Sequence, residues 1–470
     1  MTGTTPTRAT TSSKRTASGR PTGQLALDEL RQHVQSGQVD TVLLALPDAQ
    51  GRLKGKRYGA HHFLDRIATG QADMCAYILA TDVDMTPADG FALTSWESGY
   101  QDLHAVPDLA TIRLLPWMPH TALVHADAQH HDGQPLRLAP RHILRHQLAR
   151  LAERGLTAKA GLETEFILYQ GNYDQAAEDD YQHLRPVTTD NLDYALDHNP
   201  QLDRFLHRLQ TALAGAGLSV EAIKTESAPG QVEITFPYAD ALAACDGHTV
   251  LKHAVRAIAQ RSGMAPTFMA APETRLANGL HLHLSLWCDN RPALVTDAGE
   301  LSRLAQQALA GLVESLADFA PLYAPTVNSY KRFTTASFAP TRMTWGYDNR
   351  TCAVRVVGRG DGLHLEIRLP GADANPYLAV AASLAAIMDA IDRKLQPPPP
   401  CTGNAYRTEQ GRAVPLTLQD ALRSFLDSPT AQKAFGGDVV EHYAHLGELE
   451  LAAHRQAVTD VERRRRFTRA

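Results

Sequence analysis

The segment GLETEFILY, residues 161–169, places two acids at alternate positions within an otherwise apolar run. A period of two is typical of a β-strand with one face in a core and the other face open. Glu163 and Glu165 then project from the same face, roughly 6.6 Å apart along the strand. At an effective dielectric constant near 20 their repulsion would be about 2.5 kcal/mol, so a cation between them is expected if water is excluded. For this pair alone, a solvated strand face is the alternative.

Three further segments have the same pattern, namely VEAIKTESAPGQVEITF (residues 220–236), NGLHLHLSLW (residues 278–287) and GLHLEIRLPGADANPYL (residues 362–378). The polar side chains that they would collect on one face are Glu221, Glu226 and Glu233, then His281, His283 and Ser285, and finally His364, Glu366 and Arg368. Taken alone, the first of these segments also fits an acidic hairpin, the second a strand with structural histidines, and the third a surface ladder of ion pairs. Together they favour one polar cleft on a sheet, and Asn375–Pro376 predicts the start of an apolar helix after it.

The chemistry of this cleft follows from its ligand types. Carboxylates outnumber imidazoles and no thiol is among them, which favours hard cations such as Mg²⁺ or Mn²⁺ and more ions than one. The segment SYKRFTTASFAPTRMTWGYDNR, residues 329–350, adds Lys331, Arg332, Arg342 and Arg350. Such cations clamp phosphate or carboxylate oxygens, so we expect metal-assisted phosphoryl transfer from a nucleotide. The phosphate-loop motif GxxxxGK[ST] does not occur.

Composition narrows the class of protein. The chain has 470 residues, 44% of them hydrophobic, which predicts two domains of mixed α+β type. With 46 Lys and Arg against 51 Asp and Glu, no nucleic-acid partner is expected. Five scattered cysteines predict a reduced, cytoplasmic protein. The longest apolar run, residues 377–388, is too short for a membrane span, so no membrane partner is expected.

The ordered motifs resemble those of glutamine synthetases. They are ETEF, ESAPGQVE, HLHLSL, NSYKR, DNR followed by VR, and LEIR leading to ANPYL. The resemblance covers the chain from about residue 25 and implies a β-grasp domain over 25–120 and a glutamine synthetase/guanido kinase-like catalytic domain over 121–470. It also implies a homo-oligomeric ring, commonly a dodecamer, with active sites at subunit interfaces. Residues 1–24 are rich in Thr, Ser and Arg without an apolar core, and this composition predicts a disordered tail.

The same resemblance assigns roles to residues. Glu165, Glu226 and Glu233 would hold one metal, and Glu163, His281 and Glu366 the second, with two or three Mg²⁺ or Mn²⁺ ions in each site. Glu221, His283, Ser285 and Arg355 would contact ATP. Arg332, Arg350 and Arg368 would hold L-glutamate and the transferring phosphate and act in catalysis. The implied reaction forms γ-glutamyl phosphate and then an amide.

The nucleophile is predicted from departures within the family. Phe338 stands in the flap, residues 334–342, where ammonia-using members carry a glutamate. Those members also have two aspartates in the ammonium pocket, and this chain matches only one of them, with Asp102. An apolar pocket with fewer charges suits a primary amine better than ammonium. We therefore predict a glutamate–amine ligase whose amine is a polyamine or a small amine such as ethanolamine. The alternatives are a true glutamine synthetase and a non-catalytic ring protein, and Tyr406, at a position modified in some members, is expected to be an ordinary surface tyrosine.

Overall fold

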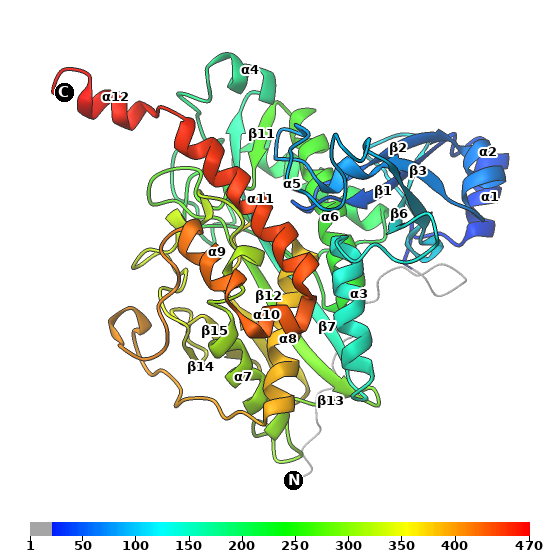
Figure 1. Cartoon of the computed structure of the whole chain (residues 1–470). Helices are drawn as coiled ribbons and strands as arrows, with labels where there is room; N and C mark the ends of the chain where they lie inside the picture. Colours follow the sequence, from blue (N-terminus) through cyan, green and yellow to red (C-terminus); the bar gives the residue numbers. More distant parts are fainter. Residues whose placement is uncertain (1–20) are drawn as a thin grey trace, which may run out of the picture.

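Two β-sheets organise the chain in the computed structural model, which describes residues 21–470 (Figure 1). Most of the predicted N-terminal tail lies outside the described residues. Its last part is placed, and Gln24 forms a β-bridge with Arg113 of the N-terminal sheet.

The N-terminal sheet has the strand order β2-β1-β6-β4-β3, with β5 paired to β6. Its elements are α1 (Leu27–Gln35), β1 (Thr41–Pro47), β2 (Leu53–Gly59), α2 (Ala60–His62), β3 (Ala72–Cys75), β4 (Asp102–Pro107), β5 (Arg113–Leu114) and β6 (Thr121–Gln129). Antiparallel pairing of β1 with β2 forms a hairpin, and Leu30 and Val34 of α1 share a core with Val42 and Leu44 of β1. Because β6 pairs with both β1 and β4, this sheet continues past the domain boundary that the sequence suggested at residue 120.

The second sheet has ten strands and is mainly antiparallel, with the order β14-β15-β16-β12-β7-β9-β8. Its strands are β7 (Thr157–Gln170), β8 (Ala222–Thr225), β9 (Gln231–Thr235), β10 (Ala239–Asp240), β11 (Met264–Thr267), β12 (Leu280–Cys288), β13 (Arg291–Pro292), β14 (Trp345–Tyr347), β15 (Val354–Val357) and β16 (His364–Ile367). The four segments with alternating polar residues supply β7, β8 and β9, β12 and β16, as their period predicted. This mixture of a largely antiparallel sheet with helices confirms the α+β class.

Most helices of this domain pack over the apolar side of the sheet, but the last one has no buried residue and projects away from it (Figure 1). The helices are α3 (Pro140–Ala152), α4 (Tyr173–Glu178), α5 (Pro200–Gly215), α6 (Ala241–Gln260), α7 (Arg303–Ser315), α8 (Pro376–Arg393), α9 (Leu418–Leu426), α10 (Pro429–Phe435), α11 (Gly437–Gln456) and α12 (Asp460–Arg466). The predicted cap of α8 is present, since the Asn375 side chain accepts a hydrogen bond from the Tyr377 amide (3.1 Å). Within residues 21–470, no helix combines the length and apolarity needed to cross a membrane.

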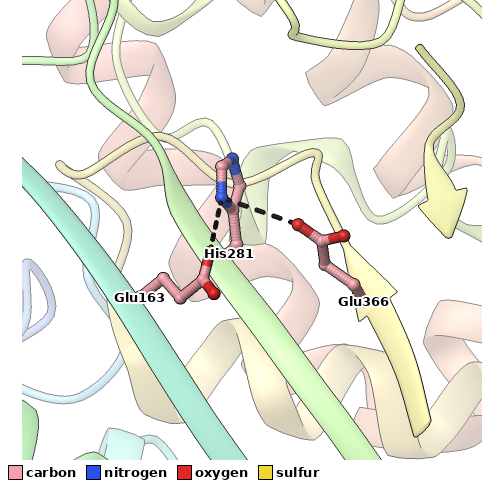
Figure 2. A group of neighbouring side chains, drawn as sticks. All are labelled: Glu163, His281 and Glu366. Carbon is pink, nitrogen blue, oxygen red and sulfur yellow. Dashed lines mark hydrogen bonds and ion pairs between the residues drawn. The ribbon is translucent and has the colours of Figure 1, made fainter. Parts of the chain in front are cut away.

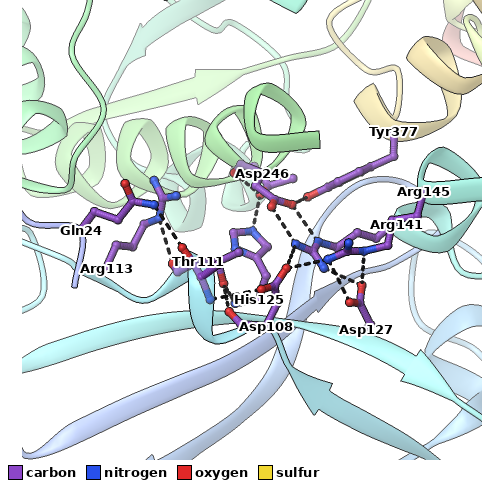
Figure 3. Close-up of polar contacts among 12 residues, drawn as sticks. Gln24, Asp108, Thr111, Arg113, His125, Asp127, Arg141, Arg145, Asp246 and Tyr377 are labelled. Atoms are coloured by element: carbon purple, nitrogen blue, oxygen red, sulfur yellow. Dashed lines mark hydrogen bonds and ion pairs between the residues drawn. The ribbon is translucent and has the colours of Figure 1, made fainter. Parts of the chain in front are cut away.

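A buried ionic network joins the N-terminal domain to the helices of the second domain (Figure 3). Arg141 of α3 is 2% exposed and donates to Asp108 (2.6 Å) and Asp127 (2.5 Å) of the N-terminal domain. It also donates to Asp246 of α6 (2.9 and 3.0 Å), which in turn accepts from the Tyr377 hydroxyl (2.7 Å). Removing one partner of such a buried network would leave an uncompensated charge, so these contacts hold the domains of one chain together.

Candidate active site

The polar side chains of neighbouring strands share the face of the ten-stranded sheet opposite the core. The register of β7 and β12 sets Glu163 across from His281, and the register of β12 and β16 sets His283 across from Glu366. Leu282, between the two histidines, points the other way and is fully buried in the core. The alternation therefore produces one polar surface on a rigid sheet.

One group on this surface consists of Glu163, His281 and Glu366 (Figure 2). The Nδ1 atom of His281 lies 3.3 Å from Glu163 Oε2 and 3.7 Å from Glu366 Oε1. Each residue offers one ligand atom, and these atoms lie within 4.8 Å of one another. Two carboxylates and one imidazole at this spacing can hold a divalent cation. This trio is the same set that the sequence resemblance assigned to the second metal.

A second group contains Glu165, Glu233 and His281. It differs from the predicted set of Glu165, Glu226 and Glu233, because Glu226 accepts a hydrogen bond from the Lys224 ammonium. The structure thus brings together two of the three predicted ligands and adds His281, which contributes to both groups. Sequence reasoning missed Lys224, which lies within a quoted segment but has the wrong charge for a metal ligand.

The acids of this site carry negative charge that their protein neighbours do not fully neutralise. Burial, together with the charges of Glu163 and Glu165, raises the pKa of Glu233 to about 9. Burial acts in the same direction on Glu163, but hydrogen bonds from His281 and His283 hold the pKa of that carboxyl well below its usual range. A divalent cation would relieve the repulsion among these carboxylates. The donor set therefore fits a hard metal ion.

A neutral side chain orients Glu165. Its Oε2 atom accepts from the Gly279 amide (2.7 Å) and from the Gln231 amide nitrogen (3.2 Å). The same Gln231 nitrogen lies 3.0 Å from the Asn278 side-chain oxygen. Such outer contacts fix the position of a ligand carboxylate. Gln231 stands in the GQVE segment, but an uncharged amide gave no signal for selecting it.

Three of the predicted arginines border the acids. Arg368 donates to Glu366 Oε1, and Arg355 donates to Glu366 Oε2 (2.9 Å). Arg332 is 3% exposed and donates to the backbone oxygen of Arg368 (3.2 Å), and burial lowers its pKa to about 10, so it remains charged near neutral pH. Arg350 is exposed, between β14 and β15. The first three can therefore offer positive charge beside the carboxylates, whereas Arg350 lies at the surface.

Two of the residues predicted to contact the nucleotide, His283 and Ser285, lie on β12 beyond His281. His283 Nε2 is 3.1 Å from Glu163, and its Nδ1 is 3.0 Å from the His364 ring. Ser285 comes next on the same face and is partly exposed. Glu221 is exposed immediately before β8. His364 belongs to the same polar surface, as the strand pattern predicted, although the family resemblance gave it no role.

The flap crosses close to these arginines. Its Phe338 side chain is 56% exposed, and the backbone φ is +62° at Ala336 and +57° at Phe338. Residues other than glycine rarely adopt this left-handed backbone conformation. Arg368 donates to the Phe338 carbonyl (3.3 Å), and the Tyr406 hydroxyl donates to the Ala339 carbonyl (3.1 Å). Tyr406 is partly buried and its hydroxyl holds the flap, a contact that the sequence did not predict, while its unmodified state stays a prediction.

Asp102 lies apart from this surface. It is exposed at the start of β4, where it pairs with Cys75 of β3 in the N-terminal sheet. Within residues 21–470, no ion pair or side-chain hydrogen bond joins Asp102 to the polar face of the ten-stranded sheet. A role for Asp102 in the site would require the N-terminal domain of another subunit.

Comparisons with known proteins agree with this geometry. Residues 137–466 match the catalytic domain of glutamine synthetase. The chain is 46% identical over 449 residues to a γ-glutamylethanolamide synthetase, GlnA4, of Streptomyces coelicolor, covering 95% of this chain and 97% of that protein. It is 34% identical to a glutamate–isopropylamine ligase of a Pseudomonas species, covering 92% and 96%. A solved GmaS/ADP complex superposes with a TM-score of 0.80 at 30% identity, covering 93% of this chain and 99% of that one.

Proposed function

This chain belongs to the glutamine synthetase family, and from that premise we propose that it joins the γ-carboxylate of L-glutamate to a primary amine at the expense of ATP. The enzyme is an ATP-dependent ligase that forms a C–N bond. Its relatives include a γ-glutamylethanolamide synthetase, a glutamate–isopropylamine ligase and a glutamate–methylamine ligase. We assign it a small primary amine, with ethanolamine the first candidate and polyamines the second.

The observation that carries this proposal is Phe338 in a flap that borders the carboxylates and arginines of the polar site. A phenylalanine at this position offers apolar surface and neither negative charge nor a proton acceptor. An ammonium ion would gain little from that surface, whereas the carbon chain of an amine can pack against it. The flap is tied to Arg368 and Tyr406 through the backbone carbonyls of Phe338 and Ala339, so Phe338 stands beside an arginine that would handle the acyl phosphate, with its side chain open to a substrate.

The chain's own residues support two successive steps. In the first, the glutamate γ-carboxylate attacks the terminal phosphorus of ATP, giving γ-glutamyl phosphate and ADP, and Arg332, Arg355 and Arg368 would stabilise the charge on the transferring group. In the second, the neutral amine nitrogen attacks the acyl carbon, phosphate leaves, and the nitrogen loses a proton. Holding both substrates on one rigid sheet provides proximity.

We infer that divalent cations, Mg²⁺ or Mn²⁺, occupy the two carboxylate groups, with two or three ions in each active site. Such ions supply charge neutralisation for the phosphate oxygens. Glu163, His281 and Glu366 would hold one ion, and Glu165 and Glu233 would hold another. Glu226 remains a candidate ligand, although its carboxylate contacts Lys224 here.

We further propose that the chain forms a homo-oligomeric ring, such as a dodecamer, in which a neighbour's N-terminal β-grasp domain completes each site. The exposed position of Asp102 on the N-terminal sheet supports this arrangement. Light scattering after size-exclusion chromatography measures the oligomer. Mixed rings made from inactive Asp102→Ala and Glu165→Ala chains should recover part of the activity, because some interfaces then contain two intact halves. A lack of recovery in rings shown to be mixed would refute the shared site.

The function is tested by measuring ADP formation with ATP, L-glutamate and a panel of nucleophiles. Ethanolamine, putrescine, isopropylamine and methylamine are compared with ammonium at the same concentration of free amine, and the products are identified by mass spectrometry. We expect a γ-glutamylamide from at least one organic amine at a kcat/KM well above that for ammonium. Preferential turnover of ammonium would instead identify a glutamine synthetase. No ADP formation with any nucleophile would indicate a non-catalytic ring protein.

A further inference from the structure

A second cluster of charge lies between the domains, away from the candidate active site. Two cavities of about 560 and 480 Å³ occur where the turn between β1 and β2 meets α6. They share Gly51, Arg52, Lys252 and Arg256. None of the candidate metal ligands lines either cavity.

The smaller cavity is basic. Its charged and titratable lining residues are Arg52, Lys54, Lys252, His253 and Arg256, and we call this set the basic pocket. Within the described residues, no acidic side chain lines this cavity, although acids line the larger one. Cations gathered in a partly desolvated space repel one another unless something neutralises them.

The contacts made by these cations leave positive charge uncompensated. Arg52 is neutralised by Asp48 (2.7 Å). Lys252 is 7% exposed and donates to the Ala372 carbonyl (2.5 Å), and burial with the neighbouring Arg256 lowers its pKa to about 7. The negative charge of Asp373 raises the pKa of Lys252, but by less than burial and Arg256 lower it.

The other two cations also lack an acidic partner in the pocket. Burial and the charge of Arg52 lower the pKa of Lys54, and no hydrogen bond or ion pair of its ammonium occurs within residues 21–470. The Arg256 guanidinium lies 5.3 Å from the centre of the Phe268 ring and beside Tyr173. The negative charge of Asp48 acts on both Lys54 and Arg256, but this carboxylate already pairs with Arg52, so the positive charge at the cavity exceeds the negative charge beside it.

We propose that the basic pocket binds a small polyvalent anion, either a phosphate or a dicarboxylate, at a site separate from the active centre. A cavity of this size lies within the range of small-ligand sites. Lysine and arginine are the residues that make charge-assisted hydrogen bonds to such anions. More than one unneutralised cation favours a ligand with at least two negative charges.

Hydrogen bonds connected through the covalent structure of Ala372 and Asn278 lead from the basic pocket to the metal site. Lys252 donates to the Ala372 carbonyl, and the Ala372 amide donates to the Asn278 carbonyl (3.0 Å). Gln231 donates to the Asn278 side chain (3.0 Å) and to Glu165 (3.2 Å). An anion that draws Lys252 away from Ala372 would therefore alter the support of a metal ligand. This coupling rests on the proposed function, whereas anion binding does not.

Binding is measured by isothermal titration of the full chain with inorganic phosphate and, separately, with succinate, in the absence of divalent cations. We expect one site per chain for at least one anion, and the preferred anion identifies the ligand class. Lys54→Met should weaken binding about tenfold, the loss expected for one charge-assisted contact. Lys56→Met is the matched control, because Lys56 lies on the same strand outside the pocket and donates to the Asp73 carbonyl. Melting temperatures would verify that both variants are folded.

Absence of heat for both anions, or equal weakening in the two lysine variants, would overturn the site. Coupling is measured as the Mn²⁺ concentration that half-activates ADP formation, with and without the anion that binds. A shift in the native protein that is lost in Lys54→Met supports the coupling. Binding without any shift would refute the coupling alone, and a protein that binds the anion but has no ligase activity would contradict only the proposed function.

Discussion

Replacing Phe338 by alanine should weaken the binding of organic amines without affecting ammonium. The Phe338 side chain is 56% exposed. Because a phenylalanine offers roughly 200 Å² in all, about 110 Å² remains open to a substrate. If a chain of three or four carbons covers about half of this area, the contact stabilises binding by roughly 1.4 kcal/mol at ~25 cal/mol per Å². That free energy corresponds to about a tenfold increase in KM for the amine in Phe338→Ala.

The assay is ADP formation at saturating ATP and glutamate, with isopropylamine, ethanolamine and ammonium varied in turn. The increase in KM should be largest for isopropylamine, smaller for ethanolamine and absent for ammonium, since the loss scales with apolar area. Phe338→Leu, which keeps most of that area, is the control. Phe338→Glu should in addition raise the turnover of ammonium. Equal KM values for isopropylamine in the native protein and in Phe338→Ala would refute the role assigned to the flap.

Three other predictions concern the metal site, the flap and the junction between the domains. Glu165→Ala should abolish metal-dependent phosphate release, and Gln231→Ala should raise the half-activating Mn²⁺ concentration about 10–100-fold. If either variant responded to Mn²⁺ like the native protein, that residue would have no role in the metal site. Tyr406→Phe loses the hydrogen bond to the Ala339 carbonyl, so deuterium exchange of the flap should accelerate by about 2–10-fold, and an unaltered rate would show that another contact holds it. His125 of β6 lies 3.0 Å from the Thr249 hydroxyl of α6 at this junction, and burial lowers its pKa from 6.5 to about 4. The unfolded chain therefore takes up this proton first as the pH falls, and His125 should contribute a loss of about 3 kcal/mol in the free energy of unfolding between pH 6.5 and 4. Urea denaturation at several pH values measures this loss, which should be smaller by that amount in His125→Gln than in the native protein, and equal losses in the two proteins would contradict the assignment.

Much of the site could be predicted because strand alternation is a local property. The alternation of His281, Leu282 and His283 already assigns opposite faces to the imidazoles and the leucine, whatever the rest of the chain does. The ordered motifs then identified the family, and the α+β class followed from the same strands. The β6 strand could not be assigned in this way, because only its pairing with β1 and β4 shows to which sheet it belongs.

Long-range packing decided the partners of the polar groups. The register of β7 and β12 brings His281 into both groups of candidate metal ligands, and Lys224 donates a hydrogen bond to Glu226 that the sequence did not predict. Tyr406 reaches the flap through a contact across 67 residues of chain. The sequence by itself therefore determined which chemical groups line one face of a sheet, because that depends on a period of two along each strand. Only the tertiary structure decided which of those groups meet, because distances between side chains depend on strand register and on folding between distant segments.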